Sequence, residues 1–179
     1  MKYSTIIKTK EENILEISNV LKMLLGNYIE LKEEQFGWII VHDVEMKEAI
    51  LETLKSLETD INDTITIYQG IEDKKIYPIL ASLLSQVTYG YYDFKSLLLA
   101  SDTQSNSSEI LNYILDGSGV NDTILKAMAE SDLNVSKAAS LLFMHRNTLL
   151  YKIDRLQELK DFDLRKFNDL FILMKLLKA

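Results

Sequence analysis

Residues 134–156 read NVSKAASLLFMHRNTLLYKIDRL and decide the fold of the C-terminal part of the chain. Asn134 is a residue type that caps helices well, and the apolar positions after it follow helical spacing: Val135, Ala138, Ala139 and Leu142. After a turn at 143–145, a second helix runs to about Leu159 with Leu149, Ile153 and Leu156 on one face. Because alanine allows two helices to cross closely, the stretch predicts a compact pair of helices joined by a tight turn.

The residues on either side extend this pair into a small helical domain. Asn121 can cap a preceding helix through about Glu130, which carries apolar residues at 124, 125 and 128, and Asp132-Leu-Asn134 interrupts it. The terminal segment is a further amphipathic helix, with its apolar face assigned to Leu164, Phe167, Leu170, Phe171, Met174 and Leu177. That face either closes the domain core or forms a dimer surface, and both roles are compatible.

The polar face of the helix at about 146–159 has the chemistry of a nucleic-acid reader. Arginine and asparagine can form paired hydrogen bonds with guanine and adenine, and threonine offers a hydroxyl and a methyl group. The predicted base contacts are Arg146, Asn147, Thr148 and Tyr151. Lys152 and Arg155 are predicted to hold phosphates, whereas His145 is interpreted as a helix cap. We therefore expect this helix to enter the major groove of double-stranded DNA.

The same stretch resembles the C-terminal helix-turn-helix of PucR-type and sugar-diacid (CdaR-type) regulators. The run His145-Arg146-Asn147-Thr148 carries the most specific part of the resemblance, and Tyr151, Lys152, Ile153 and Arg155 continue it. It is similar, more distantly, to the helix-turn-helix of the nucleoid protein Fis. The resemblance implies a transcriptional regulator with a degenerate GGDEF-like domain before its DNA-binding end, and it leaves any small-molecule effector unidentified.

The N-terminal part predicts a small α+β domain. Strand-forming residues at 3–9, 27–32, 36–42 and 64–68 alternate with helical patterns over 14–25 and 46–57, and the turn of the hairpin is placed at Glu33-Glu34-Gln35. The order β-α-β-β-α-β is the ferredoxin-like arrangement, an antiparallel sheet with two helices on one face. A further helix is expected over 76–87, with Pro78 in its first turn.

The predicted domain boundary is a polar stretch, Ser101 to Ser108. The expected organisation is a regulatory or dimerisation domain at 1–100, a linker with a short helix at 101–120, and the helix-turn-helix domain at 121–179. Charge divides in the same way: residues 1–120 hold 10 basic and 19 acidic side chains, and residues 121–179 hold 10 and 8. A DNA-binding end attached to an acidic body fits this asymmetry.

Composition excludes several classes of protein. There is no cysteine, hence no disulfide and no thiolate site, and no apolar run is long enough to span a bilayer. We expect a cytoplasmic protein with no membrane association. No catalytic, cofactor-binding or metal-binding residue is assigned, because the sequence lacks a Walker loop, a dinucleotide fingerprint and the paired glycines of an active GGDEF hairpin.

Two functions are weighed. The first is a transcriptional regulator that binds DNA as a homodimer, since one helix-turn-helix contacts too few bases to specify a site. The second is a protein-interaction or ligand-sensing module whose helix-turn-helix no longer binds DNA, which the net charge of −7 favours. Salt-dependent DNA binding distinguishes them.

Overall fold

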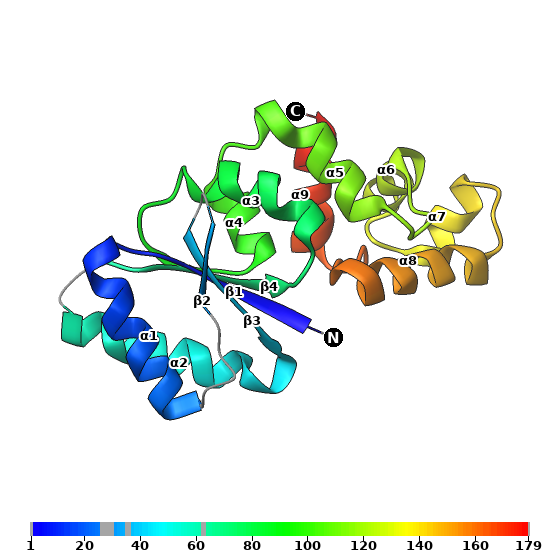
Figure 1. Ribbon diagram of the computed structural model, residues 1–179. Helices are drawn as coiled ribbons and strands as arrows, with labels where there is room; N and C mark the ends of the chain where they lie inside the picture. The colour runs from blue at the N-terminus through cyan, green and yellow to red at the C-terminus, as the bar shows by residue number, and fades with distance from the viewer. Residues whose placement is uncertain (1, 26–30, 35–36, 62–63, 179) are drawn as a thin grey trace. The chain divides into compact units, whose positions relative to one another are not determined.

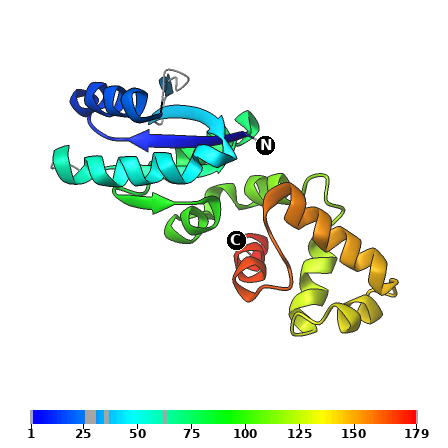
Figure 2. The same ribbon diagram turned by 90° about the horizontal axis from the view of Figure 1, so that it is seen from below.

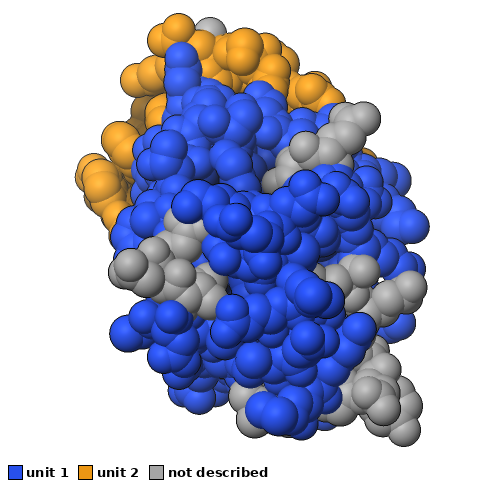
Figure 3. Space-filling view, turned by 60° about the vertical axis from the view of Figure 1, so that its left-hand side comes forward, with its two compact units in different colours: residues 1–102 blue, residues 103–179 orange. Residues whose placement is uncertain are grey.

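The computed structural model describes residues 2–25, 31–34, 37–61 and 64–178. The chain divides into two compact units, residues 1–102 and residues 103–179, which Figure 3 colours separately. The first unit contains all the described strands, and the second is helical. The predicted α+β fold class, with helices at the C-terminal end, is therefore confirmed.

The first unit is built on a five-stranded sheet with the order β2-β3-β1-β4-β5. Its first four strands are antiparallel to their neighbours, and β5 pairs in parallel with β4. The strands are β1 (Lys2–Lys8), β2 (Leu31–Glu34), β3 (Gly37–Asp43), β4 (Thr66–Ile71) and β5 (Gly90–Tyr92). With α1 (Glu11–Leu25) after β1 and α2 (Lys47–Ile61) after β3, the predicted β-α-β-β-α-β order is confirmed.

The hairpin departs slightly from its prediction. Glu33 and Glu34 continue strand β2, paired with Trp38 and Gly37, rather than forming the turn. Gln35 and the first residues of the predicted strand at 27–32 lie outside the described residues. A short 3-10 turn, η1 (Val44–Met46), leads from β3 into α2.

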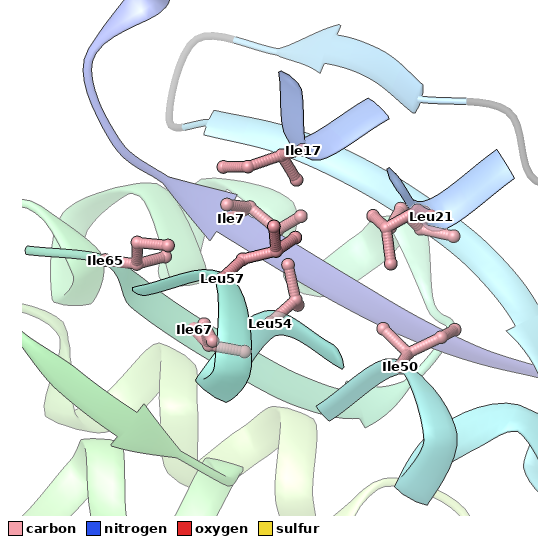
Figure 4. Packing of buried hydrophobic residues seen from close by; sticks show 9 residues of the cluster. Ile7, Ile17, Leu21, Ile50, Leu54, Leu57, Ile65 and Ile67 are labelled. Carbon is pink, nitrogen blue, oxygen red and sulfur yellow. The ribbon is translucent and has the colours of Figure 1, made fainter. Parts of the chain in front are cut away.

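Both faces of the sheet carry helices, whereas the sequence predicted one covered face. In Figure 1, α1 and α2 lie on one side of the sheet, and α3 (Tyr77–Leu84) and α4 (Phe94–Ala100) lie on the other. Alternate strand residues supply the two faces, so Ile7 points toward α1 and α2. Figure 4 shows the resulting core, in which Ile7 and Ile67 meet Ile17, Leu21, Ile50 and Leu54.

The second face of the sheet is covered by elements for which the sequence pattern is weak. The 3-10 turn η2 (Lys74–Ile76) precedes α3, which has Pro78 in its first turn as predicted. Strand β5 and helix α4 were not predicted, because β5 has three residues and shows no alternation. Asp93 and Ser96 nevertheless form a capping box that starts α4.

The second unit consists mainly of five α-helices over its described residues 103–178, preceded by the turn η3 (Gln104–Asn106). They are α5 (Ser107–Leu115), α6 (Asp122–Glu130), α7 (Val135–Leu141), α8 (Arg146–Lys160) and α9 (Phe167–Lys178). Its core includes Leu125, Met128, Leu149, Ile153, Phe162 and Leu173, each with an exposed fraction of 0%. None of the helices among the described residues has the length and apolarity needed to cross a bilayer.

The predicted linker at 101–120 differs from the structure. Ile110 and Ile114 of α5 are fully buried, and α5 contacts α8 and α9. Even polar residues of the stretch, Thr103 and Ser107, are buried. The segment 103–120 therefore belongs to the helical unit, since its helix supplies part of that unit's core.

Helix α9 closes the helical core, but through a face different from the predicted one. Leu170, Ile172, Leu173 and Leu176 are buried, whereas Phe167 and Phe171 are 69% and 51% exposed. The two exposed rings stack on each other, with centroids 6.0 Å apart. Of the predicted apolar face, Leu164 and Leu170 therefore close the core, whereas Phe167 and Phe171 do not and keep only the alternative role of a dimer surface.

Candidate nucleic-acid interface

Helix α7 starts where the sequence placed it, because Asn134 caps it. The side-chain oxygen of Asn134 accepts hydrogen bonds from the backbone N–H groups of Ser136 at 3.0 Å and Lys137 at 3.1 Å. Before it, Asp132 and Leu133 have left-handed φ angles of 53° and 64°, which reverse the chain after α6. The cap therefore sets the direction in which α7 leaves α6.

The turn between α7 and α8 is equally well defined. Phe143 has a left-handed φ of 50°, and the Met144 N–H donates to the Ala139 carbonyl at 2.9 Å. His145 then caps α8, since its Nδ1 accepts from the Asn147 N–H at 3.2 Å. His145 thus holds the start of α8, as the sequence interpretation expected.

Close packing fixes α8 against α7. Leu149, Ile153 and Leu156 are all fully buried, as predicted from their spacing. Ala138 and Ala139 of α7, which packs against both α6 and α8, are buried with exposed fractions of 0% and 2%. Because a methyl side chain adds little width, the two helix backbones can approach closely at this point. The packing of the helix pair therefore holds the outer face of α8 in a defined orientation for binding.

The predicted base-contact residues share the first two turns of α8 and face solvent. Arg146, Asn147 and Thr148 are exposed, and Tyr151 is 61% exposed. The Nε of Arg146 donates to the Ser136 hydroxyl at 3.1 Å, which ties the guanidinium to α7. The structure therefore brings these four residues together on one exposed surface, with Arg146 at its α7 edge.

Lys152 and Arg155 are tied to the loop between α5 and α6. The Lys152 Nζ donates to the Gly119 carbonyl at 2.7 Å, and the Arg155 Nε donates to the Gly117 carbonyl at 2.5 Å. Gly117 and Gly119 have φ angles of 75° and 76°, a conformation that glycine adopts without strain. Arg155 also donates to the Tyr151 hydroxyl at 3.2 Å. These contacts brace the loop and orient both cations, each of which retains further N–H donors.

Charge changes along the exposed side of α8. Its first two turns carry Arg146 and no acidic residue, whereas Asp154 and Glu158 lie in the later turns. Asp154 pairs with Arg165 at 2.9 Å, but Glu158 is exposed. Acidic groups repel phosphate, so an anionic partner is favoured most at the N-terminal turns of the helix and least beside Glu158.

A group of polar contacts centred on Arg165 stabilises the C-terminal part of α8. Arg165 contacts Asp154 and Gln157 on α8 and donates through Nε to Asp163 at 2.7 Å. Burial raises the pKa of Asp163, but the hydrogen bonds from Arg165 outweigh it, and the net pKa lies below the ordinary value. The Asp163 N–H in turn donates to Asp169 of α9 at 2.8 Å. These contacts of Arg165, Asp163 and Asp169 fix α9 relative to α8.

Sequence reasoning missed the first turn of α7 as part of this surface. Ser136 and Lys137 are exposed, and Ser136 contacts Arg146 directly. Their positions immediately after the Asn134 cap were a usable signal, because N–H groups at a helix start favour anions. The exposed surface therefore spans the first turns of two helices, α7 and α8.

Comparison with known proteins identifies the helical unit. Residues 123–179 match the family model of the PucR C-terminal helix-turn-helix domain. These residues form a PucR-type helix-turn-helix domain. The match covers α7, α8 and α9 and all six predicted contact residues. The match supports a transcriptional regulator.

The likeness of the whole chain to a solved structure is distant. No curated protein matches the chain. A solved regulator of polyketide synthase expression from Bifidobacterium adolescentis is similar to it, with a TM-score of 0.46 and 11% sequence identity, over 99% of this chain and 78% of that one. This similarity is too low to transfer any property of that regulator. Among the described residues, no group of three or more His, Asp or Glu side chains is arranged to hold a metal ion.

Proposed function

We propose that this regulator binds double-stranded DNA by inserting the start of α8 into the major groove. The observation that carries the proposal is the exposed cluster of Arg146, Asn147, Thr148 and Tyr151 on a helix whose opposite face is fully buried. Residues in the first turns of a recognition helix contact base edges. Arg146 is the residue best suited to guanine, and Asn147 to adenine.

Phosphate contacts are proposed for the flanks of this cluster. Lys152 uses one N–H donor on the Gly119 carbonyl and has two left, and Arg155 retains donors beyond those on Gly117 and Tyr151. The exposed Lys137 side chain at the start of α7 can hold a further phosphate. The acidic residues of the later turns of α8 keep that end away from the phosphates.

The regulator is proposed to act as a homodimer in the cytoplasm. One recognition helix reads few base pairs, and paired half-sites about one DNA turn apart supply the rest. The stacked, exposed Phe167 and Phe171 on α9 are the proposed self-association surface of the helical unit. The first unit, which has the predicted ferredoxin-like order of elements, is proposed to be a degenerate GGDEF-like domain that regulates DNA binding and has no enzymatic activity.

The test is a comparison of Arg146→Ala with Lys166→Ala on a DNA site selected from a random library. Lys166 is an exposed cation in the segment between α8 and α9, outside the predicted contact residues, so it is a charge-matched control. Arg146→Ala should weaken binding to the selected site by about 1 to 3 kcal/mol and lower the preference over random DNA. Equal losses on both DNAs, or equal losses for the two variants, would refute base contact by Arg146.

A further inference from the structure

The first unit contains a small cavity at the edge of its sheet. Its volume is about 210 Å³, and it is lined by α2, β4, β5 and the first turn of α4. We propose that this cavity binds a small organic anion that also carries an O–H or N–H donor. Its binding groups are Lys47 of α2 and Gln69 of β4, and the inference does not depend on DNA binding.

Gln69 offers an unused hydrogen-bond acceptor at the cavity. The residue is only 5% exposed, and its Nε2 donates to the Thr5 hydroxyl at 3.0 Å and to the Lys47 carbonyl at 2.9 Å. Because a carbonyl only accepts, these contacts fix which way the amide points. Among the described residues, none donates to the Gln69 Oε1, and this atom is not fully enclosed by protein. A ligand donor in the cavity would satisfy it.

A directional chain of hydrogen bonds holds Gln69 in this orientation. The His42 Nδ1 lies 2.8 Å from the Asp43 carbonyl, so this nitrogen must carry the proton of a neutral ring. The Nε2 of His42 then accepts from the Thr5 hydroxyl at 2.8 Å. That leaves Thr5 to accept from Gln69. Burial lowers the pKa of His42, which favours this neutral form. The acceptor is therefore preorganised before any ligand arrives.

Lys47 supplies the positive charge. Its side chain is half-buried, and its Nζ lies 5.3 Å from the centre of the Tyr3 ring. No carboxylate pairs with it within the part of the chain that the structure describes. Asp93 also lines the cavity, and its carboxylate caps α4 by accepting from the Ser96 N–H and hydroxyl, both at 2.7 Å. An anion in the cavity would compensate a cation that has limited access to water.

The remaining walls favour a flat, partly apolar ligand. Leu51, Ile67 and the rings of Tyr91 and Tyr92 line the cavity. The Tyr91 hydroxyl donates to Glu58 at 2.7 Å and the Tyr92 hydroxyl to the Tyr89 carbonyl at 2.8 Å, so both tyrosines present ring surface. The volume is below the roughly 300–1,000 Å³ of sites for drug-sized ligands, which limits the occupant to about ten non-hydrogen atoms.

The probe is 4-hydroxybenzoate, titrated into the full chain by calorimetry. It combines a carboxylate, a flat ring and one O–H donor, and a dissociation constant of about 1 mM or lower is expected. Benzoate lacks the donor and 4-hydroxybenzyl alcohol lacks the charge, so each should bind at least about tenfold more weakly. These two probes test the cavity without any change to the protein.

Two variants locate the site. Lys47→Met should weaken 4-hydroxybenzoate binding at least about tenfold, whereas Lys75→Met, which removes an exposed charge elsewhere in the unit, should leave it unchanged. Leu51→Trp should abolish binding by filling the cavity. Absence of saturable binding to the unmodified chain would overturn the proposal. Equal affinity for benzoate, or full affinity of Lys47→Met, would also overturn it.

Discussion

Asn134→Ala removes the cap that starts the helix-turn-helix. In the structure the Asn134 side chain accepts from two backbone N–H groups, whereas Asn121, which caps α6, accepts from one, that of Ile124 at 3.1 Å. Loss of an asparagine cap costs about 0.5 to 2 kcal/mol. We expect Asn134→Ala to lie in the upper half of that range, at about 1 to 2 kcal/mol, and Asn121→Ala to lie in the lower half.

The assay is urea unfolding of the full chain followed by circular dichroism, with the wild-type protein, both alanine variants and Asn134→Asp. Aspartate also caps helices, so Asn134→Asp should retain most of the stability. The midpoint should fall for Asn134→Ala while the slope with urea stays constant, which marks a change in stability alone. A loss below about 0.3 kcal/mol, or a larger loss for Asn121→Ala, would refute the assignment of the cap.

Three further predictions concern charge, pH and self-association. Lys152→Met should weaken binding to all DNA sequences alike and lower the salt slope by about one, and an unchanged slope would limit Lys152 to bracing the loop at Gly119. Because burial lowers the pKa of His42, the unfolded chain takes up its proton first, so stability should be complete above about pH 6.5 and decline below it. A His42→Gln variant should lose that part of the pH dependence when both are unfolded in urea from pH 5 to 8; an identical decline in both would contradict the assignment. Phe171→Glu should weaken the dimer at least about tenfold in sedimentation experiments, while Leu15→Glu, at a more exposed apolar position of α1, should not.

The helix-turn-helix was predictable because its signals are local. Asn121 and Asn134 cap their helices through bonds that span two or three residues. The spacing of Leu149, Ile153 and Leu156 alone defines the buried face of α8. Helical periodicity and cap chemistry depend on residues that are close in the sequence, so these helices could be predicted without knowledge of the tertiary fold.

The parts that escaped prediction depend on distant contacts. The bonds of Lys152 and Arg155 to Gly119 and Gly117 join residues 33 and 38 positions apart, and they require a left-handed loop. The polar stretch after Ser101 has the composition of a linker, yet α5 behind it packs against α9. Periodicity gives the apolar positions of a helix but not which of them meet a partner, so the sequence left open whether Phe171 closes the core or forms a dimer surface.

The buried polar chain across the sheet shows the same limit. Thr5, His42 and Gln69 come from three strands, and each taken alone resembles an ordinary strand residue. Their meeting depends on the register, which pairs Thr5 with Gln69 and sets His42 two residues along β3 from the partner of Thr5. Register follows from the folded sheet rather than from any one segment.

The most direct test of the central claim is a fluorescence-anisotropy titration of the full chain against DNA from upstream of its own gene, with random DNA as the control and salt varied. The account predicts saturable binding that prefers the upstream DNA and weakens steeply as salt rises, because several phosphates are contacted. Binding to neither DNA above background at low salt would contradict it and favour an interaction module with a helix-turn-helix that has lost DNA binding.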